Sequence, residues 1–253
     1  MISRARPLLG TVVSIRAQAR EEAFQRAFAA IEKVHALMSA RCPQSDLSRI
    51  NREAHRRAVS VHPWTLRVLR SAAAISKASQ GAFDVTLGRI GASCDDILLL
   101  PGGRVRLRRR ALLDLGGIAK GFAVDLAVAV LRRCGASGGS VNAGGDLRVF
   151  GPAEQTVRVR LPGDCSLAAP LLALRQAACA TSGGYFGSRQ IDARQRRTLC
   201  SDYSVTVRAP TCMVADALTK AVAALGPQRP LLRRFDAQAY LVDAAGTVYA
   251  PAR

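Results

Sequence analysis

The chain has 253 residues, of which 49% are hydrophobic, and its formal net charge is +19. This length suits one large domain with a buried core, so we expect a single domain over residues 1–253. No run of about 18 apolar residues is present, and no membrane-spanning helix is expected. The arginines that carry the charge are scattered and aromatic residues make up only 5%, which disfavours a nucleic-acid-binding module.

The first residues lack the features of an export signal. Arg4 and Arg6 precede strand-like residues, without the apolar stretch and small-residue cleavage site of a signal peptide. We therefore expect a cytoplasmic protein as the sequence stands, or a periplasmic one if an export segment lies upstream. Residues 7–16 predict the first strand.

Four segments have the apolar spacing or the end signals of helices. In the first, apolar residues such as Phe24, Phe28 and Ile31 recur at helical intervals. In the second, Pro63 suits the first helical position and Gly81 lies just beyond the end. Helices are expected over residues 20–39, 64–78, 118–133 and 213–225.

The remaining segments predict loops and strands. Residues 90–113 have no helical period, and the alternating arginines at 104, 106 and 108 favour the exposed face of an edge strand. Helices and strands alternate without a parallel βαβ rhythm, so we expect an α+β fold with at least one antiparallel sheet. Further strands are expected over residues 140–150, 157–161 and 203–208, and in a hairpin over 239–249.

Seven cysteines are present, and no two of them have Cys-x-x-Cys spacing. The odd count argues against a disulfide framework, and the spacing argues against a structural zinc site. We expect most of these cysteines to be small buried apolar residues.

The first segment that carries chemistry is the loop after the second helix. Asp84 lies between Phe83 and Val85, an unusual setting for a solvated carboxylate. A semi-buried carboxylate needs hydrogen-bond donors or a cation. Asp84 either contacts a nucleotide or caps a turn, and the segment alone favours neither reading.

The second segment, residues 114–121, combines two glycines with the start of a helix and Lys120. A lysine in the first turn opposes the helix dipole, so we expect Lys120 to have an anionic partner. A glycine turn, free backbone N–H groups and a lysine suit a phosphate or pyrophosphate. The pattern is not that of a Walker-type NTPase, and it supports a Rossmann fold only weakly.

Three further features are weaker when each is considered alone. Glycines interrupt residues 141–147 and 181–185, where they indicate either tight turns or a close approach of a ligand to the backbone. Asp216 and Lys220 are four residues apart and share one helix face. Their apolar flanks make Asp216 a candidate ligand or anchor, although a surface salt bridge is the alternative.

Together, in this order and spacing, these segments resemble the ApbE-like FAD:protein FMN transferases. Residues 8–11 are similar to that family's Met-Gly-Thr, and residues 45–51 match its Ser-Glu-Leu-Ser-x-Ile-Asn stretch. Close matches follow at residues 79–84, 114–125, 142–146 and 215–218.

The resemblance implies a reaction and a set of site residues. Such enzymes cleave FAD between its phosphates with Mg²⁺, attach FMN to a Thr or Ser hydroxyl of an acceptor protein, and release AMP. Positioning and charge neutralisation dominate catalysis of this kind. The resemblance does not indicate an oligomeric state. By resemblance, Leu9, Ala82, Phe83, Asp84, Asp114 and Lys120 would hold the flavin nucleotide, whereas the Gly117 carbonyl and the Asp216 carboxylate would face the metal.

The chain departs from the family at three places. Arg41 occupies the loop that usually supplies an aromatic residue over the flavin ring, and a guanidinium can also stack there. Arg189 stands where the family has the His thought to deprotonate the acceptor hydroxyl, and Arg is no base near neutral pH. Lys220 replaces the metal-binding Thr, with Thr219 one place away.

These departures leave two hypotheses open. The first is an active transferase with an altered acid–base arrangement, in which Asp192 is one candidate base. The second is a protein of the same fold that binds FAD without transferring FMN. In both, the ammonium of Lys220 would replace a metal charge beside Asp216, and dependence on Mg²⁺ would be weaker or absent.

Overall fold

The computed structural model describes residues 1–162, 164, 166–183, 190–199 and 203–250. Its largest feature is an eight-stranded sheet in which every neighbouring pair of strands is antiparallel. This confirms the α+β expectation. In spatial order the strands are β1 (Ile2–Leu8), β2 (Thr11–Ala17), β6 (Gly139–Ala143), β7 (Asp146–Phe150), β10 (Ala178–Ser182), β13 (Ser204–Ala209), β14 (Gln238–Val242) and β15 (Val248–Tyr249).

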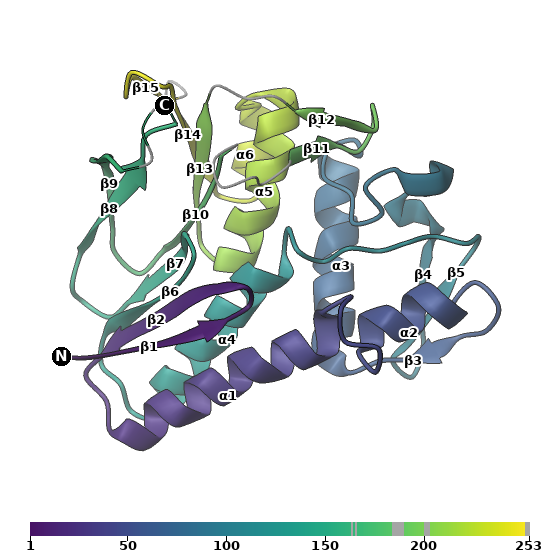
Figure 1. Ribbon diagram of the computed structural model, residues 1–253, viewed down its shortest axis with the longest axis horizontal. Coiled ribbons are helices and arrows are strands. Elements are labelled where there is room, and N and C mark those ends of the chain that lie inside the picture. The colour runs from purple at the N-terminus through teal and green to yellow at the C-terminus, as the bar shows by residue number, and fades with distance from the viewer. Residues whose placement is uncertain (163, 165, 184–189, 200–202, 251–253) are drawn as a thin grey trace.

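The four helices expected from the sequence are all present, and three of them, α1, α4 and α5, lie together beside the sheet. Helices α4 and α5 pack on one face of it, and α1 packs along α4 (Figure 1). Their apolar faces form the main core with the inward side chains of the strands, because these spacings place such residues on one stripe of each helix. The helices are α1 (Glu21–Met38), α3 (Pro63–Ala78), α4 (Ala119–Arg133) and α5 (Cys212–Leu225).

A hairpin covers part of the other face of the sheet. It consists of β8 (Gln155–Arg160) and β9 (Ala168–Leu174), which pair only with each other among the described strands. Val157 and Val159 of this hairpin form a second apolar cluster with Leu147 of the sheet. The large sheet is therefore buried on both faces where its central strands lie.

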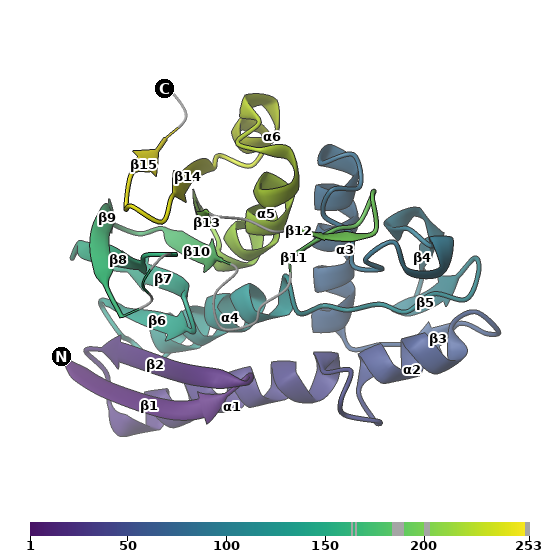
Figure 2. The same ribbon diagram turned by 45° about the horizontal axis from the view of Figure 1, so that its top comes forward.

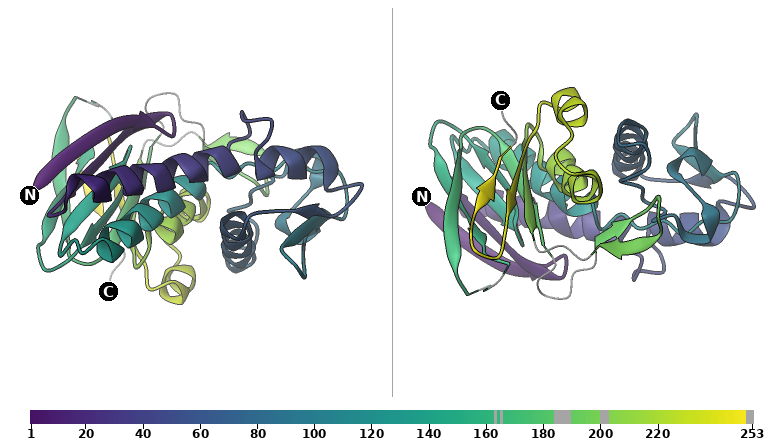
Figure 3. Two further views of the ribbon diagram at one scale, coloured as in Figure 1. Left: turned by 90° about the horizontal axis from the view of Figure 1, so that it is seen from below. Right: turned by 90° about the horizontal axis from the view of Figure 1, so that it is seen from above.

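A smaller part of the molecule lies beside the large sheet and its helices. Helix α1 runs along the large part and reaches the smaller one (Figure 3). The smaller part contains α2 (Asp46–Glu53), α3 and a three-stranded sheet in the order β3 (Val59–Ser60), β5 (Arg104–Leu107), β4 (Ile97–Leu100). The arginines of β5 are exposed as expected, but the predicted edge position is wrong because β5 is the middle strand. Alternation reports which face meets water, not whether a strand has two neighbours.

Two other local predictions were incomplete. Residues 7–16 form two strands instead of one, since Leu9 and Gly10 turn the chain with φ angles of 56° and 73°. Helix α2 was not predicted, although Ser45 caps it by accepting the N–H of Ser48 at 3.0 Å. Short helices and tight turns between residues of similar hydropathy leave little periodic signal.

Two further elements complete the part of the chain that the structure describes. The hairpin of β11 (Gln190–Asp192) and β12 (Arg197–Leu199) lies between α3 and α5 (Figure 2), and α6 (Arg229–Arg234) leads into β14. No helix in the described ranges is long and apolar enough to span a membrane.

Three of the five cysteines that the structure describes are buried as predicted, and Cys42 and Cys134 are half-buried. Cys94, Cys179 and Cys212 are buried, and burial raises the pKa of Cys94 and of Cys179 to about 12. These thiols are therefore packing residues and not nucleophiles at neutral pH. Cys165 and Cys200 lie outside the described residues.

Candidate functional site

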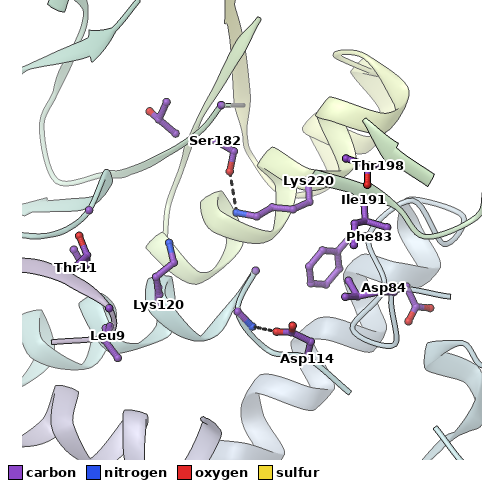
Figure 4. A pocket seen from close by; sticks show the side chains of 18 of the residues that line it. Leu9, Thr11, Phe83, Asp84, Asp114, Lys120, Ser182, Ile191, Thr198 and Lys220 are labelled. Atoms are coloured by element: carbon purple, nitrogen blue, oxygen red, sulfur yellow. Dashed lines mark hydrogen bonds between the residues drawn. The ribbon is translucent and has the colours of Figure 1, made fainter. Parts of the chain in front are cut away.

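A cavity of about 780 Å³ lies where turns from both parts of the molecule meet α4 and α5 (Figure 4). Every segment that stood out in the sequence contributes to its wall or lies directly behind it. The lining residues are Leu9, Gly10, Thr11, Ala82, Phe83, Asp84, Leu87, Arg89, Asp114, Gly116, Gly117, Lys120, Ala143, Gly144, Thr181, Ser182, Gly183, Ile191, Thr198 and Lys220.

Two hairpin turns of the large sheet form one wall of the cavity. The β6–β7 turn contains Gly144 with φ of 64°, and a Cβ there would overlap the hydroxyl of Thr11 in the neighbouring β1–β2 turn. The turn is held by the side chain of Asn142, which accepts the N–H of Gly145 at 3.0 Å. Glycine is required here because the backbone is left-handed and the two turns touch, which leaves main chain facing the cavity.

Helices α4 and α5 cross in close contact beside the cavity. A Cβ on Gly121 would overlap the carbonyl oxygen of Cys212, so only glycine permits this approach. The same Gly121 donates its N–H to Oδ2 of Asp216 at 3.2 Å. This crossing sets Lys120 of α4 and Lys220 of α5 on the wall of one cavity.

Lys120 has the anionic partner that its place at a helix start predicted. Its Nζ lies 2.6 Å from Oδ2 of Asp146, the first residue of β7, which is 1% exposed. Burial alone would lower the pKa of Lys120, but the carboxylates of Asp216 and Asp146 raise it. Lys120 is therefore a fixed cation at the cavity wall, with a protein carboxylate as its partner in this structure.

Asp216 and Lys220 form a second ion pair. The carboxylate of Asp216 is fully buried, and its Oδ1 accepts a hydrogen bond from Nζ of Lys220 at 2.6 Å. Nζ also donates to Oγ of Ser182 at 3.0 Å, which links α5 to β10. Lys220 faces the cavity, and Asp216 lies behind it.

The two carboxylates differ in their pKa. Burial, and then the negative charge of Asp216, raise the pKa of Asp146 to about 6. Burial would also raise the pKa of Asp216, but Lys220 and Lys120 outweigh it and hold that pKa below its usual value. Two lysines and two buried carboxylates thus balance in charge, and Asp216 is the more firmly ionised of the two acids.

The loop that contains Asp84 forms the opposite wall. Oδ1 of Asp84 accepts the N–H and the hydroxyl of Thr86, both at 2.7 Å, and Oδ2 accepts the N–H of Cys94 at 2.7 Å. These donors satisfy the buried carboxylate without a ligand. Asp84 therefore caps a turn, as one of the two interpretations of the sequence predicted. Its contact with a nucleotide stays a prediction.

The residues around Asp216 do not fit a resident divalent cation. Magnesium needs several oxygen ligands at about 2.0–2.1 Å. Here Oδ1 of Asp216 is taken by an ammonium and Oδ2 by the N–H of Gly121. No group of three His, Cys, Asp or Glu side chains suited to a metal occurs in the part of the chain that the structure describes.

The structure brings seven of the eight residues named from the sequence to the cavity wall, and Asp216 lies behind it. Four further lining residues come from segments that the sequence had singled out: Thr11 from the segment similar to Met-Gly-Thr, and Gly144, Thr181 and Ser182 from the two segments where glycines indicated either tight turns or a close ligand. Leu87 and Arg89 were missed, as were Ile191 and Thr198 of the β11–β12 hairpin, because none of these four belongs to a glycine or charge pattern.

The three departures from the family pattern fall in different places. Arg41 is exposed between α1 and α2, and it is not among the lining residues described above. Arg189 lies outside the described residues. Asp192 is 1% exposed and is held by Arg194 at 3.0 Å, which lowers the pKa of that carboxyl and makes it a weak base.

Comparisons with known proteins find one relative by sequence and several solved structures of similar fold. A FAD:protein FMN transferase from Vibrio cholerae is 26% identical, over 79% of this chain and 72% of that protein. The solved ApbE protein of Thermotoga maritima superposes with a TM-score of 0.85 at 24% identity, covering 98% of this chain and 96% of the other. The flavinyl transferase ApbE of Pseudomonas stutzeri gives 0.82 at 20% identity, covering 98% and 94%.

These solved structures share the fold of the chain. The model of the ApbE family matches residues 9–242, a span that includes both ion pairs and all the lining residues of the cavity. The chain belongs to the ApbE family.

Proposed function

We propose that the chain transfers FMN from FAD to a Thr or Ser hydroxyl of an acceptor protein and releases AMP. The observation that carries the proposal is the cavity itself, in which glycine turns and two lysines from separate helices face one space. Its volume of about 780 Å³ lies within the roughly 300–1,000 Å³ typical of ligand sites. Membership of the ApbE family supports the same assignment.

The chemistry asks the protein mainly for positioning and positive charge. The acceptor oxygen attacks the phosphorus of the FMN half, the bond from that phosphorus to the AMP phosphate breaks, and the hydroxyl proton is released. Charge that gathers on the phosphate oxygens in the transition state is stabilised by fixed cations. Lys120 and Lys220 can supply this positive charge from two helices. The turns at Gly144 and Gly117 can bring backbone N–H groups close to the dinucleotide.

A second candidate function is FAD binding without transfer. It is favoured by Asp192, whose carboxylate is engaged with Arg194 and is therefore a poor base for the acceptor hydroxyl. Both functions need the same cavity, so they differ only in whether a product forms.

The test is an assay that reads binding and transfer separately. The purified chain is incubated with FAD and a Thr- or Ser-containing candidate acceptor, with Mg²⁺ and with EDTA. Quenching of flavin fluorescence reports binding, and chromatography with in-gel fluorescence reports AMP and flavinylated acceptor. We expect all three signals. Quenching with neither product across a panel of acceptors would favour the binding protein, and the absence of quenching would contradict both functions.

A further inference from the structure

Lys220 occupies the position that the resemblance assigns to a metal-binding threonine. Its ammonium contacts the buried carboxylate of Asp216 at 2.6 Å and Oγ of Ser182 at 3.0 Å, and the lysine lines the cavity (Figure 4). A Cβ on Gly117 would lie 3.4 Å from Cε of Lys220, so the lysine stem lies close to this glycine. One side chain therefore contacts the Asp216 carboxylate and lies close to Gly117, the two residues that the resemblance assigned to a metal.

Thr219 does not compensate for the missing threonine ligand. It is fully buried, and its hydroxyl donates to the backbone carbonyl of Asp216 at 2.7 Å and meets Oγ of Ser182 at 2.9 Å. These contacts direct the hydroxyl toward the α5 backbone and β10. A divalent cation at Oδ1 of Asp216 would have to displace the Lys220 ammonium and would be repelled by it.

We propose that the ammonium of Lys220 is the resident cation of this site, and that the chain binds FAD and transfers FMN without a divalent cation. The inference rests on the proposed function and concerns how the same site neutralises phosphate. An ammonium has three N–H donors. Among the described residues, Asp216 and Ser182 take two of them, and the third is available to a phosphate oxygen in the cavity.

The placement of the two lysines supports the same conclusion. The pyrophosphate of FAD carries two negative charges, and the ammonium groups of Lys120 and Lys220 lie on the wall of the cavity, where they can donate to its oxygens. Both lysines are paired with carboxylates that lie behind the wall, so both ammonium groups are at the cavity before a ligand arrives. Preorganised cations of this kind stabilise phosphate charge without a metal that must first bind.

The first experiment needs no variant. FAD affinity of the wild-type chain is measured by fluorescence quenching in EDTA and in millimolar Mg²⁺. We expect dissociation constants that agree within about twofold. A loss of tenfold or more in EDTA would overturn the inference while leaving the proposed function intact. If FAD fails to bind in either buffer, the proposed function itself is wrong, and the inference fails with it.

The second experiment restores the ligand that the lysine replaced. Lys220→Thr removes the ammonium beside Asp216, so we expect its FAD affinity to fall at least tenfold in EDTA and to recover with Mg²⁺. Lys77→Thr is the matched control, because it removes an exposed lysine from α3 and should leave the affinity unchanged in both buffers. A Lys220→Thr variant that binds FAD like the wild type in EDTA would contradict the role of the ammonium.

A direct readout of metal binding completes the test without FAD. Mn²⁺ replaces Mg²⁺ and is followed by electron paramagnetic resonance. We expect Lys220→Thr to bind one Mn²⁺ that is lost in Lys220→Thr/Asp216→Asn, whereas the wild type binds none at this position. Mn²⁺ binding by the wild type that disappears in Asp216→Asn would overturn the inference, and this result does not depend on whether Lys220→Thr folds.

Discussion

Two lysine–carboxylate pairs face the same cavity, and they are built differently. Lys220 and Asp216 lie one turn apart on α5, whereas Lys120 of α4 reaches Asp146 on β7. Each pair has an N–O distance of 2.6 Å. The pKa of Asp216 is lowered, but that of Asp146 is raised to about 6. The two ion pairs therefore have the same N–O distance, although the pKa values of their carboxylates shift in opposite directions.

The difference follows from what surrounds each acid. Asp216 is close to both lysines and accepts the N–H of Gly121, so its charge is well compensated. Asp146 is buried and lies near the negative charge of Asp216, and the lysines offset this only in part. We infer that Asp216 anchors its lysine firmly, whereas Asp146 holds Lys120 in a way that a ligand anion can replace.

Neutralising each acid in turn tests this difference between the two ion pairs, and it should give the largest of the effects predicted here. Asp216→Asn removes a carboxylate that the fold prefers ionised, and it leaves Lys220 without its counter-ion, so we expect the free energy of unfolding to fall by about 3 kcal/mol. Asp146→Asn removes a carboxylate whose raised pKa shows that the fold stabilises its charge less, and Asp216 still interacts with Lys120, so we expect a smaller loss of about 1 kcal/mol. Urea denaturation at pH 7 measures both.

The ordering of these two variants is the decisive result. Both substitutions keep the side-chain shape and remove one negative charge, so each serves as the control for the other. An Asp146→Asn variant that is less stable than Asp216→Asn would show that the two pairs do not differ in the way their pKa values indicate.

The second prediction concerns the lysine that is held less firmly. Lys120→Met keeps the apolar stem and removes the charge, so a lost contact with phosphate should weaken FAD binding by about 10- to 100-fold, the value of a hydrogen bond to a charged group. Fluorescence quenching measures the affinity, and Lys77→Met on the exposed face of α3 is the control. Unchanged affinity in Lys120→Met would refute a phosphate contact.

The same two pairs show how far the sequence could predict this site. The pair of Asp216 and Lys220 was predictable, because residues four apart on one helix share a face. The partner of Lys120 was expected only as an anion. Asp146 lies 26 residues away on a different element, and a sequence without an alignment does not fix which strand end meets which helix start.

The fold shows the same limit. Long periodic helices such as α1 and α5 were predicted nearly to their ends. The β11–β12 hairpin, which supplies Ile191 and Thr198 to the cavity, has short strands and no periodic signal. Local spacing predicts elements and faces, whereas a cavity depends on contacts between distant segments that local spacing does not encode.

The smallest expected effect is a pH dependence that belongs to Asp146. Because burial and the charge of Asp216 raise its pKa to about 6 in the fold, the folded state binds this proton more tightly than the unfolded chain. Its contribution to stability is therefore present at low pH, and it declines as the pH rises from about 4 through 6. The same proton removes the carboxylate charge that competes with a phosphate for Lys120.

We therefore expect FAD affinity to rise severalfold, and by no more than about tenfold, as the pH falls from 7 to 5. Fluorescence titrations at constant ionic strength measure this. Asp146→Asn should bind FAD with the same affinity across that range, because the competing charge is absent at every pH. Asp216 has a lowered pKa and stays ionised there, so it does not add to the effect. A dependence that persists in Asp146→Asn would assign the titration to another group and would remove the reason for treating Asp146 as the exchangeable partner of Lys120.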